Sequence, residues 1–253
     1  MDALELSNGE GLDQRLRRLT DARVRLGRSG AGLPTKAVQS FLLDHARARA
    51  AVWSELDTNR LKQELVHLQV PILSLRSDAG DRATYVRRPD LGRRLSRDSL
   101  DILPRHASRY DVALVIGDGL SATAVDVNAG PTATALFPKL LKQGLTVAPV
   151  VLVKNARVAV GDWIAEALGA RIVVMLIGER PGLSAADSLG AYVTYNATKG
   201  TPDSRRNCIS NIREGGLPVA QAASALANLI SRMGLSQQRY VASHRIRPDL
   251  WHA

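Results

Sequence analysis

Apolar positions in the central part of the chain form short continuous runs, and these alternate with segments of helical periodicity. Val112–Ile116, Val147–Val153 and Ile172–Ile177 are such runs, each with the length and composition of a strand buried on both faces. Between the last two runs, Gly161–Ala170 repeats its apolar residues at helical spacing. This alternation predicts an α/β fold: a Rossmann-like, mostly parallel sheet flanked by helices.

The chain before residue 111 has a different pattern, with helical spacing over most of its length. Leucines recur every three or four residues over Leu12–Leu19 and again over Leu61–Leu68. The segment Pro34–Leu56 also has helical spacing of its apolar residues. Val70–Ser77 is typical of a strand, and Arg82–Leu95 of an exposed basic stretch. We therefore expect an N-terminal helical extension in front of the main sheet.

Helix signals near the C-terminus complete the division of the chain. Ser121 can cap a helix, a further helix is expected over Thr132–Gln143 with Gly144 closing it, and Val219–Met233 carries a regular apolar stripe. These patterns predict four regions: a flexible tail at 1–14, a helical and basic partner-contacting region at 15–110, an α/β ligand-binding region at 111–235, and a flexible basic tail at 236–253.

Thr146–Asn211 contains three unusual segments, each expected to be a loop that follows a strand. They are Lys154–Val158, Gly178–Gly182 and Asn207–Asn211. In an open parallel sheet, the loops at the carboxyl ends of neighbouring strands meet at one crevice, where ligands bind. The sequence therefore predicts one ligand site built from these segments.

Composition and charge narrow the class of protein. The 253 residues are 45% hydrophobic, enough for a real core, and the formal net charge of +10 makes an anionic partner plausible. A single cysteine excludes an internal disulfide and a cysteine-clustered zinc site. The N-terminal residues lack the pattern of a signal peptide, and no apolar run is long enough to span a bilayer. We expect a soluble protein of the cytoplasm.

The segment Gly117–Ser121 occupies the place of a phosphate-binding turn between a strand and a helix. It lacks the third glycine of the dinucleotide fingerprint, since position 122 is alanine, and it has no Walker lysine. A tight structural turn is therefore favoured over a phosphate site. Asp118 would then accept hydrogen bonds from backbone amides.

Glu179 and Cys208 are the side chains of the three segments with the clearest chemical potential. Glu179 follows a strand directly, so its carboxylate could accept hydrogen bonds from a ligand or pair with Arg180 at the surface. Cys208 could be a nucleophile, but no histidine lies nearby in sequence, and a buried, inert thiol is favoured. The five histidines show no metal-ligand spacing.

The arginine-rich part of Arg82–Leu95 would suit nucleic acid or a protein partner. Tyr85 is the one aromatic residue there, so base stacking on nucleic acid is disfavoured. Proline and glycine in a set pattern favour a shaped contact with a protein.

Five segments carry a resemblance to a known family. They are Tyr85–Leu95 (YVRRPDLGRRL), Gly117–Ser121 (GDGLS), Gly178–Gly182 (GERPG), Cys208–Gly216 (CISNIREGG) and the loop at Arg23–Gly30. The first four occur in this order along the chain, and together with the loop at Arg23–Gly30 they closely resemble the small subunit of ethanolamine ammonia-lyase, from about residue 16 to residue 233.

The resemblance implies an adenosylcobalamin-dependent lyase that converts ethanolamine to acetaldehyde and ammonia. The family's large subunit is a (β/α)₈ barrel that holds the substrate, and the small subunit closes over the cobalt corrinoid between them. The assembly is a hexamer of heterodimers, often associated with a bacterial microcompartment. No nucleic acid and no membrane is expected as a partner.

By position, the family's small-subunit contacts to the cofactor carry over to Val158, Glu179 and Cys208. The resemblance implies that Glu179 accepts hydrogen bonds, that Val158 supplies backbone groups and apolar contact, and that Cys208 packs. It implies no catalytic residue and no metal ligand in this chain.

Two rival functions rest on other features. A stand-alone Rossmann-type nucleotide-binding enzyme would use Gly117–Ser121. A nucleic-acid-binding module would use the charge of +10, with strongly salt-dependent retention on DNA.

Overall fold

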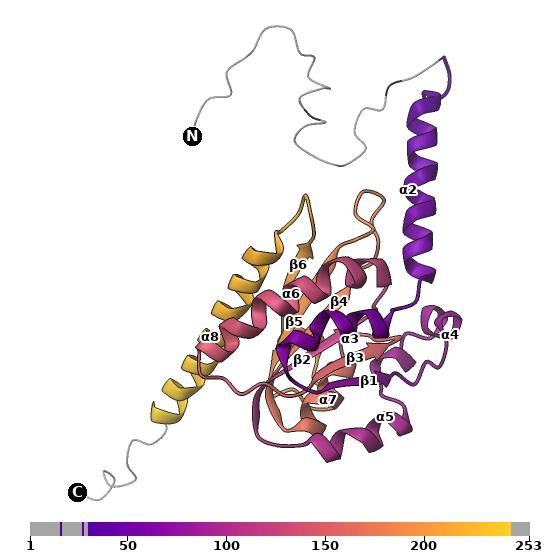
Figure 1. Cartoon of the computed structure of the whole chain (residues 1–253). Coiled ribbons are helices and arrows are strands. Elements are labelled where there is room, and N and C mark those ends of the chain that lie inside the picture. The colour runs from indigo at the N-terminus through magenta and orange to yellow at the C-terminus, as the bar shows by residue number, and fades with distance from the viewer. Residues whose placement is uncertain (1–15, 17–26, 28–29, 244–253) are drawn as a thin grey trace, which may run out of the picture.

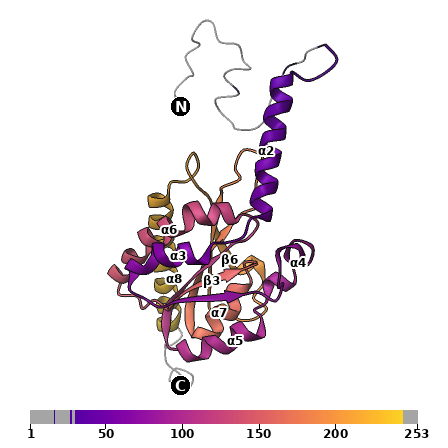
Figure 2. The same cartoon turned by 45° about the vertical axis from the view of Figure 1, so that its right-hand side comes forward.

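The structure, a computed structural model, describes Leu16, Gly27 and residues 30–243, with side chains through residue 234. The helix expected over Leu12–Leu19, the loop at Arg23–Gly30 and the tail at 1–14 lie wholly or mostly outside these residues. Figures 1 and 2 show a sheet covered by helices on both faces, with α2 (Thr35–Trp53) extending away from it. None of the helices in the described ranges is long and apolar enough to cross a membrane.

The described residues form one six-stranded sheet with the strand order β1-β3-β2-β4-β5-β6. The first four strands in this order are parallel, whereas β5 runs antiparallel to both β4 and β6. The predicted α/β fold with a mostly parallel sheet is therefore confirmed. The strands are β1 (Ile72–Arg76), β2 (Tyr110–Gly117), β3 (Val150–Lys154), β4 (Ala170–Gly178), β5 (Leu189–Tyr195) and β6 (Arg206–Ile212).

Helices cover the two faces of the sheet in separate layers. One face is covered by α3, α6 and α8, and the other by α7, α5 and the short helix η3. The remaining short helices lie in the connections. The bounds are α3 (Thr58–Leu65), α4 (Arg82–Arg87), α5 (Arg97–Ile102), α6 (Ala122–Lys142), α7 (Val160–Leu168), α8 (Val219–Ser243), η1 (Val66–Leu68), η2 (Leu91–Arg93), η3 (Leu103–His106) and η4 (Asp203–Arg205).

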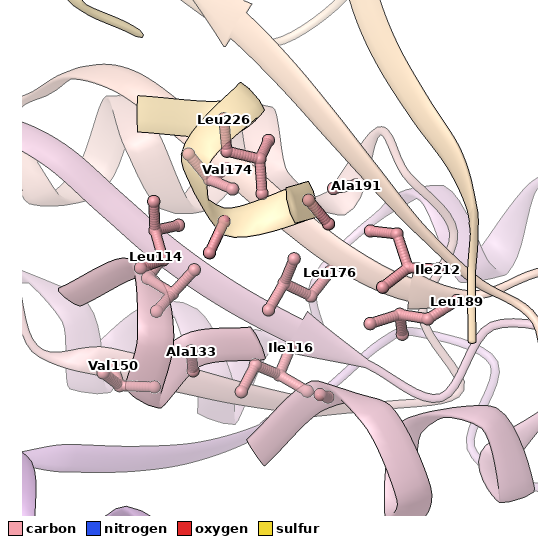
Figure 3. Close-up of a cluster of buried hydrophobic side chains, with 14 of the residues drawn as sticks. Leu114, Ile116, Ala133, Val150, Val174, Leu176, Leu189, Ala191, Ile212 and Leu226 are labelled. Carbon is pink, nitrogen blue, oxygen red and sulfur yellow. The ribbon is translucent and has the colours of Figure 1, made fainter. Parts of the chain in front are cut away.

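The central strands are buried on both faces, as their continuous apolar sequences predicted. Leu114 and Val115 are adjacent in β2 and both are fully buried. Leu114 packs in the cluster that includes Leu176 and Leu226 (Figure 3), whereas Val115 packs in the cluster beneath α7. Side chains alternate along a strand, so both faces of this sheet need apolar residues.

The chain changes direction across the sheet at β2. The connection from β2 runs through α6 to β3 on one side, and the connection from β3 runs through α7 to β4 on the other. A crevice forms at such a switch point, outside the carboxyl ends of the strands. The loops that follow β2, β3 and β4 therefore meet at one end of the sheet.

The helix capped by Ser121 and the further helix expected over Thr132–Gln143 form one continuous helix, α6. It begins directly after Ser121, whose hydroxyl accepts a hydrogen bond from the amide of Ala124, and it continues through Pro131 and Pro138 to Lys142. Prolines remove backbone hydrogen bonds inside a helix. Tertiary packing overrides this cost, because the helix buries an apolar face on the sheet: Val125, Ala129, Ala133, Leu136 and Leu140. Gly144 follows the helix with φ +73°, as predicted.

The stretch Arg82–Leu95 is not uniformly exposed, so that prediction is wrong. Arg82, Tyr85 and Leu95 are buried, and α4 forms part of the stretch. The charge density of the segment suggested a solvated surface, but the guanidinium of Arg82 is paired inside the protein with Asp118. Buried charges of this kind occur when they are paired.

The outer helices α2 and α8 begin where predicted but differ from expectation in other respects. α2 begins after Pro34 as predicted, but Val38, Leu42 and Trp53 on it are 38%, 57% and 51% exposed. α8 continues beyond Met233 to Ser243, so helix covers the start of the predicted tail at 236–253. Residues 244–253 of that tail lie outside the described range.

Candidate functional site

A pocket of about 400 Å³ lies at the carboxyl ends of the central strands, where the strand order switches. The turn after β2, the loop after β3 and the loop after β4 all contribute to its walls. Its lining residues are Tyr85, Gly119, Leu120, Arg157, Val158, Ile177, Gly178, Glu179, Arg180 and Tyr192. Two of the three segments predicted to converge on one site therefore do so.

The buried carboxylate of Asp118 joins the turn after β2 to the loop after β3. Its oxygens accept hydrogen bonds from the backbone amides of Asn155 and Ala156, each at 2.8 Å, and from the Arg82 guanidinium at 3.3 Å. The predicted role of Asp118 as an acceptor for backbone amides is confirmed. Burial raises the pKa of Asp118 above its usual range, and the nearby charge of Arg82 opposes this shift.

Tyr85 forms the buried wall of the pocket beside that loop. Its phenol donates a hydrogen bond to the carbonyl oxygen of Ala156 at 2.9 Å. Two guanidinium groups face its ring, Arg82 at 4.7 Å and Arg157 at 4.5 Å from the centroid. Burial raises the pKa of Tyr85, so the phenol stays protonated and remains a donor. Gly92 makes room for this packing, because a Cβ there would lie 2.9 Å from both Tyr85 and Arg157.

The Gly117–Ser121 turn serves close packing between strands. A Cβ on Gly119 would clash with the carbonyl oxygen of Gly178, and Gly119 has φ +56°. The amide of Leu120 donates to that same carbonyl at 3.0 Å, and the amide of Ser121 donates to the carbonyl oxygen of Asp118. These two amides are thus already bonded within the protein, which favours the structural turn over a phosphate site.

Glu179 is held at the end of β4 by the neighbouring strands. Its Oε2 accepts hydrogen bonds from the Ser188 hydroxyl and from the amide of Asn211, the latter at 3.2 Å. Gly190 lies beneath the carboxylate, since a Cβ there would be 3.0 Å from Oε1. Within the described residues Glu179 forms no ion pair with Arg180, and its Oε1 accepts no hydrogen bond. One oxygen of a fixed, half-buried carboxylate is therefore available at the pocket.

Val158 reaches the same pocket from the loop after β3. Its half-buried side chain packs against the apolar cluster beneath α7 and lines the pocket on its other side. The structure thus brings Val158 and Glu179 into one cavity from two different strands.

Asn207–Asn211 is not a loop but the greater part of β6, the edge strand. Its polar side chains suggested a loop because an edge strand in this position buries few of them; Ile212 alone in β6 is fully buried. The backbone pairs with β5, and that pairing makes the strand. No residue of this segment is among the lining residues of the pocket, but its carboxyl end lies beside Glu179, because the amide of Asn211 donates a hydrogen bond to the Glu179 carboxylate.

Cys208 is exposed, so the prediction of a buried thiol is wrong. It lies opposite Tyr192 across the β5–β6 pair, and Tyr192 lines the pocket. Partial burial raises the pKa of the thiol, and burial raises the pKa of Tyr192 to about 12. Neither group is charged near neutral pH, so Cys208 is not an activated thiolate.

The sequence does not reveal several residues of the site. Arg157 lies in the predicted segment Lys154–Val158, but only its neighbour Val158 carries a predicted role. Tyr192 and the Arg82–Asp118 pair were not expected, although an aromatic residue in a strand next to an edge is a usable signal. No cluster of three or more potential metal-ligating side chains lies in the described ranges.

Comparison with known proteins gives the family. Residues 12–240 match the family model described as ethanolamine ammonia-lyase light chain (EutC). The ethanolamine ammonia-lyase small subunit of Bradyrhizobium diazoefficiens is 52% identical over 225 residues, 88% of this chain and 86% of that protein. The small subunits of Ralstonia nicotianae and Rhodopseudomonas palustris are 48% and 50% identical over 221 and 216 residues. These matches cover 86% and 85% of this chain, and 82% and 83% of those proteins. A match of this extent shows that the chain belongs to the ethanolamine ammonia-lyase light chain family.

Proposed function

We propose that this chain is the small subunit of an adenosylcobalamin-dependent ethanolamine ammonia-lyase, and that it covers the corrinoid cofactor against a large barrel subunit. The observation that carries the proposal is the pocket at the switch point of the sheet, into which Val158 and Glu179 converge. The family resemblance assigns both of these residues to the cofactor. Their meeting in one cavity supports that assignment.

The chemistry of the pocket fits a corrinoid. Such a cofactor has a broad apolar rim and many carboxamide side chains, so it needs contact area and a few polar anchors. Leu120, Val158 and Ile177 offer apolar area, and the available oxygen of Glu179 offers an acceptor for an amide N–H. When bound, adenosylcobalamin supplies the radical chemistry that rearranges ethanolamine, whereas the protein binds and orients it.

The size of the pocket supports a shared site. Pockets for drug-sized molecules span about 300–1,000 Å³, and a corrinoid is much larger than a drug-sized molecule. A pocket of about 400 Å³ can therefore hold only part of its periphery. We infer that a second chain contributes the rest, and that closure between the two chains keeps water from the reacting centre.

Cys208 has a modest role in this proposal. As an uncharged, exposed thiol beside Tyr192, it would provide a contact surface at the rim of the cofactor. The lining residues contain no histidine or cysteine, so we assign the chain no cobalt ligand at this pocket. We assign to none of its residues the abstraction of a hydrogen atom from the substrate.

The N-terminal region at 15–110 is proposed to contact the large subunit. The names of the relatives, small subunit and light chain, imply a larger partner. α2 carries exposed apolar side chains, among them Leu42 and Trp53, and extends away from the sheet (Figure 1). Its C-terminal end is fastened to the wall of the pocket, because the Arg82 side chain donates to the carbonyl oxygen of Val52 at 2.6 Å. A partner that covers the pocket can therefore reach α2 as well.

The proposal is tested by producing the chain together with a large subunit of ethanolamine ammonia-lyase. We expect co-purification, a corrinoid absorption spectrum after adenosylcobalamin is added, and conversion of ethanolamine to acetaldehyde and ammonia. A chain that neither binds the large subunit nor supports deamination would overturn the proposal. The molar mass of the complex would test the hexamer of heterodimers, which stays a prediction, as do the cytoplasmic and microcompartment locations.

A further inference from the structure

Arg157 places a guanidinium without an acceptor in the wall of the pocket. Among the described residues its side chain forms no ion pair and no hydrogen bond, and its Nε is buried without a partner. A buried donor that loses water and gains no acceptor costs about 1–3 kcal/mol, and more when it is charged. An arginine in this state is therefore expected to meet an acceptor that comes from outside the chain.

The side chain of Arg157 is held in place by the packing around it. Its backbone amide donates to the carbonyl oxygen of Gly92 at 2.8 Å, and the lack of a Cβ on Gly92 leaves room for its aliphatic part. The guanidinium lies 4.5 Å from the ring centroid of Tyr85. That ring is fixed in turn by its hydrogen bond to Ala156. Arg157 is thus pre-positioned, which lowers the entropy lost when it binds a ligand.

The contacts within the chain do not replace the missing acceptor. A cation–π contact contributes about 0.5–2 kcal/mol, but it offers no lone pair for the N–H groups of Arg157. The ring of Tyr85 also contacts a second guanidinium group, that of Arg82, at 4.7 Å from the ring centroid. The carboxylate that could have neutralised the pair of guanidinium groups, Asp118, is bonded to Arg82 and to backbone amides. The N–H groups of Arg157 therefore have no acceptor among the described residues.

We propose that Arg157 donates hydrogen bonds to an oxygen of the ligand bound in this pocket. Together with the available oxygen of Glu179, it gives the pocket one fixed donor and one fixed acceptor. A primary carboxamide presents both matching groups, a carbonyl oxygen and an N–H. The inference rests on the proposed function, since the side chains of a corrin are carboxamides; a phosphate oxygen of the nucleotide tail has the same acceptor chemistry.

The test compares variants of this chain in the complex with the large subunit. Arg157→Met removes the donors while keeping an unbranched side chain on the Tyr85 ring, so the fold should be retained. Arg157→Lys restores a charged donor without the planar fork. Arg109→Gln is the matched control, because Arg109 is exposed and precedes β2, at the end of the sheet opposite the pocket. Dissociation constants are measured by absorption titration with cobalamin and with cobinamide, which lacks the nucleotide tail.

We expect Arg157→Met to weaken cobalamin binding about 10- to 100-fold at an unchanged thermal unfolding midpoint. Arg157→Lys should recover part of this loss, and Arg109→Gln should bind cobalamin within about twofold of the wild type. If the affinity for cobinamide falls by the same factor, the acceptor is a corrin carboxamide. If only the affinity for cobalamin falls, the acceptor is the phosphate.

The inference is overturned if Arg157→Met binds both corrinoids as the wild type does. It is also overturned if that variant unfolds, because Arg157 would then be a structural residue. A wild-type complex that binds no corrinoid would refute the proposed function itself, and this result is distinct from the other two.

Discussion

Removal of the Asp118 carboxylate tests how the pocket is held together. Asp118 is 2% exposed and Arg82 is 7% exposed, so their ion pair lies inside the protein. The same carboxylate accepts the backbone amides of Asn155 and Ala156, which begin the loop that carries Arg157. Asp118→Ala therefore leaves a buried cation and two buried amides without their acceptor.

The expected loss of stability follows from these contacts. Removal of one partner of a buried ion pair destabilises a protein by about 3–5 kcal/mol. Each unsatisfied amide costs about 1–3 kcal/mol when it stays dry, but the loop can relax toward water, so these costs do not add in full. We expect Asp118→Ala to lower the free energy of unfolding by about 3–5 kcal/mol. Asp118→Asn keeps one acceptor oxygen and should cost less, about 1.5–3 kcal/mol.

The assay is urea unfolding of the full chain, followed by circular dichroism. The Arg76–Asp98 pair provides the control, because it is also an arginine–aspartate pair but its side chains are 57% and 75% exposed. Asp98→Ala should change the free energy of unfolding by no more than about 1 kcal/mol. Should Asp118→Ala yield no folded protein, Asp118→Asn decides. Equal effects at the buried and the exposed pair would refute the reasoning.

Three further predictions concern the neighbourhood of the pocket. Cys208 is the one thiol of the chain, and its raised pKa means that less thiolate is present at a given pH. Its alkylation rate should therefore reach half-maximum at a higher pH than that of free cysteine. Tyr192→Phe should move that midpoint higher still, because the hydrogen bond from Tyr192 lowers the pKa of the thiol; an unshifted midpoint would contradict the contact. Glu179→Gln in the complex should weaken cobalamin binding roughly tenfold while the turnover number at saturating cofactor is kept, and a collapse of turnover at unchanged affinity would count against a pure binding role. Gly119→Ala should lower the free energy of unfolding in urea by about 2–5 kcal/mol, because it adds a clash to a left-handed backbone. Gly144 is also left-handed but has open space around it, so Gly144→Ala should lower the free energy of unfolding by only about 1–2 kcal/mol.

Several elements could be read directly from the sequence because their signals are local. The run Val112–Ile116 has to be buried on both faces, and it lies in β2 at the centre of the sheet. Val219–Met233 has one apolar stripe, and it packs on the sheet as the first part of α8. Glu179 was placed correctly at the end of a strand, since a strand followed by glycine and a charged residue marks its own boundary.

The errors arose where contacts distant in sequence overrode a local signal. A separate helix was expected over Thr132–Gln143, but packing against the sheet carries α6 from Ala122 through Pro131 to Lys142. The arginines after residue 81 suggested solvent, but Arg82 meets Asp118 from a segment 36 residues away. Cys208 suggested burial by its residue type, but the edge position of β6 leaves it exposed.

The sequence by itself determined the α/β class, the buried central strands, the family, and two of the side chains that line the pocket. Periodicity, turn residues and short motifs act over a few positions, so they survive without knowledge of the rest of the chain. Only the tertiary structure decided that Asn207–Asn211 is an edge strand, that Asp118 ties two loops together, and that Arg157 lies in the pocket wall without an acceptor. Those features depend on which groups meet after the strands assemble in the order β1-β3-β2-β4-β5-β6, and that order brings together residues that no local pattern connects.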